Sequence, residues 1–227
     1  MIRTVAESGS TNDDVAALAR EGAPEGTWLR AGRQTGGKGR QGRAWQSPPG
    51  NLHASTLVRV RPGDPPAPTL ALVAAVALHE VVEIYAPSVR IKWPNDLLFD
   101  GAKLAGILLE REGDAVIVGF GVNLASHPDS LERPATSLAA LGGMAPEPAP
   151  FLEVLSRNLS RWLAIWRDQG VAAVRAAWLA AAHPLGTPLV TSEGEGLFEG
   201  LDESGALRLC LADGSLRVIH AGDVFLL

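Results

Sequence analysis

Cysteine, histidine and long apolar runs are scarce in this sequence, and each scarcity excludes a class of protein. The single cysteine, Cys210, excludes an intramolecular disulfide and any cysteine metal cluster, and the five scattered histidines show no metal-ligand spacing. The longest apolar run, residues 70–78, is far too short to span a membrane, and no signal segment follows Met1. The sequence therefore predicts a cytoplasmic protein without membrane association. Its 227 residues, 46% of them hydrophobic, suffice for one large core with a small appendage or for two domains.

Acidic residues are absent from one interval, between Glu25 and Asp64. That interval holds seven cations, namely Arg30, Arg33, Lys38, Arg40, Arg43, Arg59 and Arg61. The whole chain nevertheless carries a net charge of −5 with a pI near 5.5, which does not suit a general DNA or RNA binder. A positive segment on an acidic body instead predicts a specific anionic small molecule as the ligand.

Residues 36–43 combine four glycines with three cations. Glycine lets the backbone approach a ligand closely and cations neutralise phosphate, so the segment is typical of an anion-binding loop. It contains no apolar side chain, so we expect it to be mobile alone and ordered by a polyphosphate ligand. Two known fingerprints are incomplete here. Pro48 and Pro49 argue against the helix that a dinucleotide-binding G-x-G-x-x-G needs, and Gly39 replaces the Ser or Thr of a phosphate-binding G-x-x-x-x-G-K.

Hydrophobic periodicity predicts strands and helices ahead of a strand-rich end. Strands are expected at residues 2–6, 27–33, 52–61, 89–93, 97–99, 103–109 and 115–124. Helices are expected from residue 11 to about residue 21 and at residues 69–85, 136–141, 151–168 and 171–182, with residues 146–150 in a loop. Four or five short strands between residues 188 and 227 predict a small β-barrel.

Four short polar motifs lie at the ends of these predicted elements. They are Ser10-Thr11-Asn12, Lys92-Trp93-Pro94-Asn95-Asp96, Lys103 with Gly106, and Gly121 with Asn123. Each has an ordinary structural interpretation as a helix cap, a turn, a solvated strand edge or a strand cap. Each also presents groups that a ligand can use, because a helix N-terminus has free N–H groups and a strand glycine leaves room beside the sheet.

Together with Gln34, residues 37–43 and Trp45, these motifs follow the order found in the biotin protein ligases, and the chain resembles that family over essentially its whole length. The resemblance implies an α+β fold with two domains. Residues 1–183 would form a catalytic domain with a mixed or antiparallel sheet flanked by helices, like that of class II aminoacyl-tRNA synthetases. Residues 184–227 would form a small C-terminal SH3-like β-barrel. The implied reaction has two steps: biotin and ATP, with Mg²⁺, give biotinyl-5′-adenylate, and a lysine of a biotin carboxyl carrier protein then takes the biotinyl group.

The resemblance also implies the site residues, position by position. Biotin is expected to contact Ser10, Thr11, Asn12, Gln34, Gly37, Lys38, Gly39, Arg40, Lys103 and Gly106. ATP is expected to contact Arg40, Arg43, Trp45, Asn95, Lys103 and Asn123. Catalytic roles fall to Lys103, which would bridge the biotin carboxylate and the α-phosphate, and to Arg40, which would restrain the adenylate; Asp96 is a candidate metal ligand. Lys38 stands where the family often has Arg, which keeps the charge but loses the bidentate fork.

The implied partner is the biotin carboxyl carrier protein of acetyl-CoA carboxylase or a related carboxylase, and a homodimer is a candidate assembly. Ser10 lies only nine residues after Met1, so we expect no N-terminal DNA-binding domain and no sequence-specific DNA binding. Two alternatives stay open: a lipoate or octanoate ligase of similar fold, and a non-catalytic module that binds RNA or an acidic protein. The second is disfavoured because stacking aromatics among the cations are confined to Trp28 and Trp45.

Overall fold

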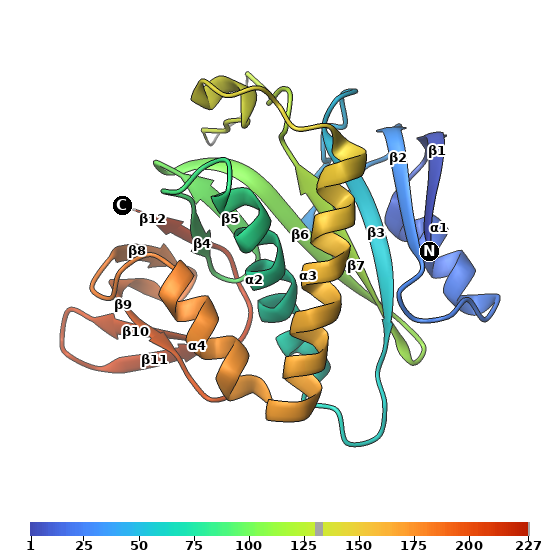
Figure 1. The fold of residues 1–227 in the computed structure, drawn as a ribbon. Helices are drawn as coiled ribbons and strands as arrows, with labels where there is room; N and C mark the ends of the chain where they lie inside the picture. The colour runs from blue at the N-terminus through green and yellow to red at the C-terminus, as the bar shows by residue number, and fades with distance from the viewer. Residues whose placement is uncertain (130–133, 227) are drawn as a thin grey trace.

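A seven-stranded mixed sheet forms the centre of the molecule (Figure 1). The computed structural model describes residues 1–129 and 134–226. The strand order is β1-β2-β3-β7-β6-β5-β4; β1 and β2 are parallel and every other neighbouring pair is antiparallel. The strands are β1 Ile2–Ser8, β2 Trp28–Gln34, β3 Leu52–Arg59, β4 Arg90–Lys92, β5 Asp96–Phe99, β6 Ala102–Glu112 and β7 Ala115–Val122. The predicted mixed or antiparallel sheet is confirmed.

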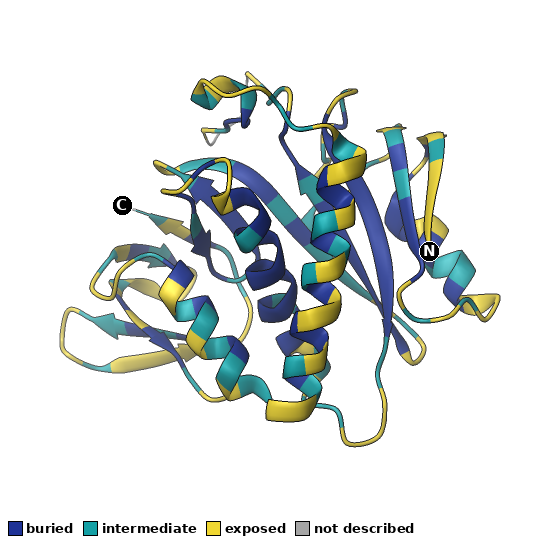
Figure 2. Ribbon diagram, in the orientation of Figure 1, coloured by how far each residue is buried: buried dark blue, intermediate teal, exposed yellow. Residues whose placement is uncertain are grey.

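The main core lies between this sheet and helices α2 (Leu70–Glu83), α3 (Pro148–Gln169) and α4 (Val171–Ala181). Helix α2 is apolar around most of its circumference because it packs against the sheet as well as α3 and α4, and Figure 2 shows it buried along most of its length. Helix α3 buries one stripe that includes Trp162 and Trp166, and the Trp166 indole N–H donates to Thr69 Oγ1 at 2.8 Å. Both tryptophans are packing residues.

Strand β3 alternates between two cores. Leu52, Ala54 and Val58 face the main core, whereas Leu57 joins a smaller cluster under helix α1 (Thr11–Arg20), with Val15 and Ile117. Ser55 lies on the same side of β3 as Leu57. This alternation brings the start of α1 against the centre of the sheet.

Two predicted boundaries were wrong. Helix α3 begins at Pro148, inside the stretch expected to be a loop, because proline is tolerated in the first helical turn, where its missing N–H has no intrahelical partner. The helix expected at residues 136–141 is only a short 3₁₀ turn, Ala139–Leu141, one of three such turns with Arg40–Gly42 and Ala67–Thr69.

The C-terminal strands form a second, antiparallel sheet in the order β11-β10-β9-β8-β12. They are β8 Pro188–Thr191, β9 Gly194–Leu201, β10 Leu207–Leu211, β11 Leu216–Ile219 and β12 Val224–Leu226. Five short strands were within the expected number; residue 227, at the end of the predicted barrel, lies outside the described residues. The Trp93 indole N–H donates to Gly205 O at 3.1 Å, so the central sheet and this second sheet are joined beside the second polar motif. Among the described residues, no helix is long and apolar enough to cross a membrane.

Candidate active site

A cavity of about 480 Å³ lies where the start of α1, the loop of residues 35–47, strands β6 and β7, and the C-terminal sheet meet. Most of the residues predicted to bind ligands line it. They are Ser10, Thr11, Asn12, Gln34, Lys38, Gly39, Arg40, Arg43, Trp45, Asn95, Asp96, Lys103 and Gly106. The fold therefore brings together motifs that are spread over almost the first half of the sequence.

The start of α1 supplies neutral hydrogen-bonding groups, and Ser10, Thr11 and Asn12 are all buried. Thr11 N donates to Gln34 Oε1 at 2.8 Å, and Gln34 Nε2 donates to Ser47 Oγ at 3.0 Å. Ser10 occupies the N-cap position with extended backbone, yet its side chain makes no capping bond. The predicted helix start is confirmed, whereas the predicted capping interaction is not formed, so the helix does not use the Ser10 hydroxyl.

Trp45 forms one wall of the cavity, and two glycines make room for it. A Cβ atom at Gly121 would lie 2.6 Å from Trp45 Cζ2, and one at Gly106 would lie 3.3 Å from Trp45 Cζ3. Both glycines stand on adjacent positions of the paired strands β6 and β7. The indole can therefore lie flat over the sheet only because these two positions carry no side chain.

Asp96 lies between two lysines on the cavity wall. Its carboxylate oxygens are 2.7 Å from Lys103 Nζ and 3.4 Å from Lys92 Nζ, and Lys103 Nζ lies 5.6 Å from the centre of the Trp45 ring. Lys92 also donates to Val224 O at 3.0 Å. One carboxylate between two ammonium groups leaves an excess of positive charge, and Asp96 holds Lys103 at a fixed place beside the indole.

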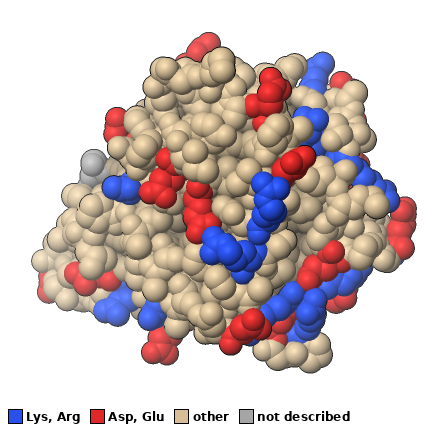
Figure 3. Space-filling model, viewed as in Figure 1, with Lys and Arg blue, Asp and Glu red and all other residues tan. Residues whose placement is uncertain are grey.

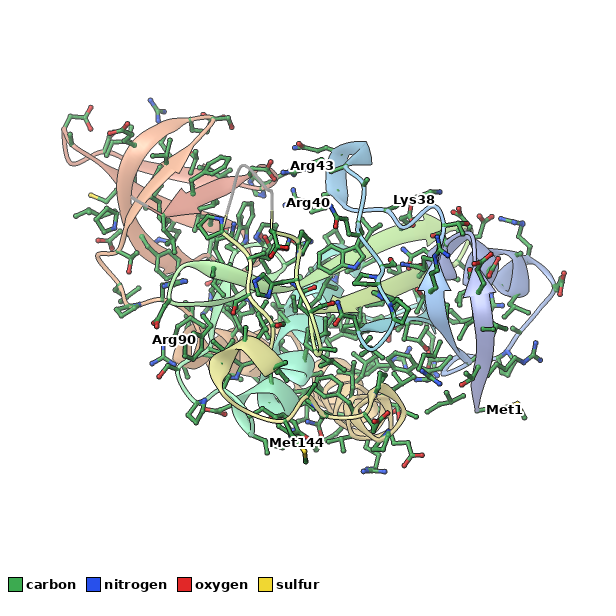
Figure 4. The ribbon with its side chains drawn as sticks, turned by 90° about the horizontal axis from the view of Figure 1, so that it is seen from above. Met1, Lys38, Arg40, Arg43, Arg90 and Met144 are labelled. Atoms are coloured by element: carbon green, nitrogen blue, oxygen red, sulfur yellow. The ribbon has the colours of Figure 1, made fainter. Side chains whose placement is uncertain are left out.

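The glycine loop is closed on itself by Gly39 N, which donates to Arg43 O at 2.7 Å. Its two arginines contact the segment between β11 and β12: Arg40 Nη2 donates to Gly222 O at 3.0 Å, and Arg43 Nη2 lies 2.8 Å from Asp223 Oδ2. Arg40 Nη1 is also 3.6 Å from Asp223. Figure 4 shows Arg40 and Arg43 at the part of the loop nearest the C-terminal sheet, and Lys38 nearer to β1 and α1. The loop, expected to depend on a ligand for order, thus has protein partners.

Lys38 pairs with an acidic side chain of α1, because its Nζ lies 2.7 Å from both carboxylate oxygens of Asp13. This hydrogen bond raises the pKa of Lys38, and the charges of Asp13 and Glu110 add to the effect. The side chain is 45% exposed, so the pair lies at the mouth of the cavity.

The seven cations of the acid-free interval do not form one positive site, contrary to the prediction. Only Lys38, Arg40 and Arg43 line the cavity. Arg61 pairs with Glu25 at 2.9 Å and Arg59 pairs with Asp114 at 2.7 Å. The interval lacks acidic residues in the sequence, but acidic residues from outside it pair with its arginines in the folded chain. On the face seen in Figure 3, charges of both signs are interspersed rather than gathered into a basic area.

Two predicted site residues do not line the cavity. Gly37 lies behind it, where a Cβ atom would come within 2.6 Å of Trp45 O. The Asn123 side chain, 3% exposed, donates to Thr136 O at 3.0 Å, and Asn123 N donates to Leu104 O. Asn123 therefore ties the end of β7 to the loop after residue 133, and its nucleotide contact stays a prediction.

No group of three or more His, Cys, Asp or Glu side chains able to hold a metal occurs within residues 1–129 and 134–226. The carboxylates that line the cavity are Asp96 and Asp223, and each already lies beside two cations. Such a donor set does not suit a metal held by protein alone, although Mg²⁺ in nucleotide sites is commonly held by phosphate oxygens with one or two carboxylates.

Two family models match the chain: the biotin/lipoate A/B protein ligase family over residues 9–123, and the biotin protein ligase C terminal domain over residues 191–227. A biotin acetyl-CoA-carboxylase ligase of Paracoccus denitrificans is 42% identical over 97% of this chain and 98% of that protein. The chain belongs to the biotin protein ligase family. This chain is also 35% identical to a biotin acetyl-CoA-carboxylase ligase of Mycobacterium tuberculosis, over 97% of this chain and 86% of that protein.

The structural comparison agrees with the sequence comparison. A biotin protein ligase from Aquifex aeolicus in complex with biotin and ATP has a TM-score of 0.89 and 26% identity, covering 100% of the ligase and 99% of that chain. The predicted fold class and the predicted activity, ATP-dependent ligation of biotin, are confirmed, and biotin is favoured over lipoate. The names of both curated relatives specify acetyl-CoA carboxylase as the protein that they biotinylate.

Sequence reasoning missed several residues at or beside the cavity, among them Ser55, Glu110, Asp223 and Val224. Ser55 contacts Thr11 and Asn12 from β3, and Glu110 contacts Asn12 from β6. The alternation of β3 gave a usable signal for Ser55, because it is a small polar residue on the face that packs under α1. Nothing local in the sequence marks Asp223 or Val224, which reach the cavity only because the C-terminal sheet lies beside it.

Proposed function

We propose that the ligase activates biotin with ATP inside this cavity and then transfers the biotinyl group to a lysine of a carboxylase carrier domain. The observation that carries the proposal is the polarity of the cavity. Neutral hydrogen-bonding groups gather at the start of α1, where the charge of Lys38 is paired with Asp13. Arg40, Arg43, Lys92 and Lys103 come from the other elements around the cavity. A ligand with an uncharged polar ring and a carboxylate tail fits this polarity, with its carboxylate beside the cations.

In the first step, a biotin carboxylate oxygen attacks the α-phosphorus of ATP, the bond from phosphorus to the bridging oxygen breaks, and pyrophosphate leaves. Two anions must approach, so fixed positive charge is needed where the new bond forms. We assign this role to Lys103, which Asp96 holds at 2.7 Å. Arg40 would restrain the adenylate, and Arg43, Trp45 and Asn95 would serve the nucleotide. In the second step, the neutral amine of the carrier lysine attacks the carbonyl carbon, the bond from that carbon to the phosphate oxygen breaks and AMP leaves, and the nitrogen loses one proton to solvent.

Mg²⁺ would enter with the phosphates and supply charge neutralisation on their oxygens. We propose that the chain contributes mainly cations to this chemistry, because the cavity carboxylates are already engaged by lysine and arginine. The metal-binding role of Asp96 stays a prediction, as do the contact of Gly37 with biotin, the domain division between residues 183 and 184, the homodimer, the cytoplasmic location and the absence of DNA binding. The acetyl-CoA carboxylase carrier is the proposed acceptor, as the names of the two curated relatives suggest.

The test is biotin-dependent exchange of labelled pyrophosphate into ATP with Mg²⁺, because this measures adenylation without any acceptor. We expect exchange with biotin and at most weak exchange with lipoate or octanoate. Exchange that needs lipoate and ignores biotin would contradict the proposal. Transfer is then measured by adding a carrier domain and following its biotinylation by mass spectrometry.

A further inference from the structure

Asn12 lies flat across three neighbouring strands, over a row formed by Ser55 of β3, Gly119 of β7 and Leu108 of β6. A Cβ atom at Gly119 would come within 3.0 Å of the Asn12 side-chain carbon, so the missing side chain makes room for the amide. Glu110 follows Leu108 by two residues in β6, and its Oε2 lies 2.6 Å from Asn12 Nδ2. Nothing in the reaction steps above uses Glu110.

The partners of the Asn12 amide fix which way round it points. A carboxylate can only accept hydrogen bonds, and so can the Leu108 carbonyl oxygen, 3.5 Å from Asn12 Nδ2. A reversed amide would place two unprotonated oxygens 2.6 Å apart at Glu110. Glu110 therefore holds Nδ2 on its own side and leaves Asn12 Oδ1 facing Ser55 Oγ at 2.6 Å.

This orientation determines where the hydroxyl protons go. Three oxygen–oxygen contacts follow in a chain: Asn12 to Ser55 at 2.6 Å, Ser55 to Thr11 at 2.7 Å, and Thr11 to Gln34 at 3.0 Å. Ser55 and Thr11 have one hydroxyl proton each, so only two of the three contacts can contain a proton. Since Asn12 Oδ1 can only accept, Ser55 must donate to it, and Thr11 must then donate to Ser55. The contact left without a proton is the longest, between Thr11 Oγ1 and Gln34 Oε1.

From this chain we infer that Glu110 is a positioning residue that makes the part of the cavity beside Thr11 and Gln34 a hydrogen-bond acceptor for the two ring N–H groups of biotin. The inference rests on the proposed use of biotin in this cavity. Thr11 Oγ1 and Gln34 Oε1 face each other with no proton between them, and a ligand N–H satisfies both. The cyclic urea of biotin carries two N–H donors, whereas the dithiolane of lipoate and the chain of octanoate carry none. Glu110 thus contributes to specificity without touching the substrate.

Glu110→Gln is the decisive variant, because it keeps the size of the side chain. A glutamine amide can either accept from Asn12 Nδ2 or donate to Asn12 Oδ1, so it no longer fixes the orientation of Asn12. In the reversed orientation Ser55 donates to Thr11 and Thr11 donates to Gln34. We expect the KM for biotin in pyrophosphate exchange to rise about tenfold, as the loss of acceptors for one or two hydrogen bonds implies. The KM for ATP should change by less than about twofold, because no nucleotide contact is lost.

The matched control is Glu112→Gln. Glu112 stands two residues further along β6 and pairs with the exposed Arg20 at 2.7 Å, so its loss should leave both KM values unchanged. Glu110→Asp keeps the carboxylate and should recover part of the affinity for biotin. If Glu110 had only a structural role, the shorter aspartate would bind biotin more weakly than the glutamine variant, which keeps the side-chain size. The inference would be overturned if Glu110→Gln and wild-type protein had equal KM values for biotin and thermal melting showed that both are folded.

The charge of Glu110 also helps to raise the pKa of Lys38, so the variant could change binding through electrostatics. A modified ligand separates this electrostatic effect from the orientation of Asn12. The probe is a biotin analogue in which a ring oxygen replaces one ring N–H. Wild-type protein should bind it about tenfold more weakly than biotin, and Glu110→Gln should reduce that ratio to about threefold. An unchanged ratio would overturn the inference. Absence of biotin-dependent exchange in wild-type protein would instead overturn the proposed function itself.

Discussion

At the scale of single residues, the cavity depends on side chains whose positions are set by an immediate neighbour. Lys103 is held by Asp96, and the Trp45 indole is held by the space that Gly106 and Gly121 leave. Both arrangements can be tested by single substitutions, because each neighbour performs one identifiable task.

Replacing Lys103 by Ala removes the ammonium group assigned to the reacting carboxylate and phosphate. We expect pyrophosphate exchange to fall at least about 100-fold with little loss of stability, since the side chain is one third exposed and a lost electrostatic contact costs about this much. Arg61→Ala, which removes a cation far from the cavity, should keep near-normal exchange. Undiminished exchange in Lys103→Ala would remove Lys103 from the mechanism.

Gly121→Ala would place a Cβ atom against the Trp45 ring. The indole would have to move, so we expect the KM for ATP to rise about tenfold while the KM for biotin changes less. Gly143→Ala is the control, because the nearest atom to its added Cβ is Leu138 O at 3.8 Å. Unchanged kinetics for both variants would show that Trp45 does not serve the nucleotide.

The sequence motifs predicted which residues line the cavity better than they predicted which side chains contact those residues. Ser10-Thr11-Asn12, Gln34 and Lys103 could be chosen from sequence because each lies in a short motif, and all line the cavity. The partners of Asn12 could not be chosen this way, because Glu110 is 98 residues away and meets it only through strand pairing. The same limit explains the error on the basic interval: Glu25 and Asp114 reach Arg61 and Arg59 only in the folded chain.

At the scale of elements, buried histidines connect helices and strands. His79 of α2 lies 3.2 Å from Val89 O, just before β4, and is buried. Burial lowers the pKa of His79, and this outweighs the opposite effects of the Val89 carbonyl and Glu83. The unfolded chain therefore binds this proton more readily than the folded chain does, so His79 contributes its full stability above its ordinary pKa of 6.5 and less as the pH falls below that value.

We expect the melting temperature to fall between pH 7 and pH 5, and His79→Gln to reduce that fall by about 2 °C. Glutamine can still donate to Val89 O but does not gain a proton. A fall of equal size in His79→Gln and wild type would contradict the argument.

Element boundaries show what periodicity can and cannot predict. Strand β3 and helix α2 were located within about two residues, because their apolar residues follow one period throughout. The start of α3 was missed because Pro148 and Pro150 suggested a loop, although neither needs an N–H bond in the first turn.

At the scale of the whole molecule, the glycine loop and the C-terminal sheet share an ionic contact through Arg40, Arg43 and Asp223. Asp223→Asn should weaken it, because a neutral amide attracts two guanidinium groups far less than a carboxylate does. We expect faster amide hydrogen exchange in residues 36–45 of the ligand-free protein, by about fivefold, and a smaller difference once biotin and ATP are bound. Glu203→Gln, a change of an exposed residue in the turn between β9 and β10, is the control. Equal protection in all three proteins would show that Asp223 does not order the loop.

The cavity also has a consequence for synthesis on the ribosome. Its walls include Ser10, Thr11 and Asn12 near the start of the printed sequence and Asp223 and Val224 near its end. A nascent chain with its last strands still inside the exit tunnel has the biotin-facing residues outside but lacks the wall that contacts Arg40 and Arg43. We expect such a chain to hold the glycine loop less firmly over an adenylate. Confinement of the reactive intermediate would then begin only after residue 224 has left the exit tunnel.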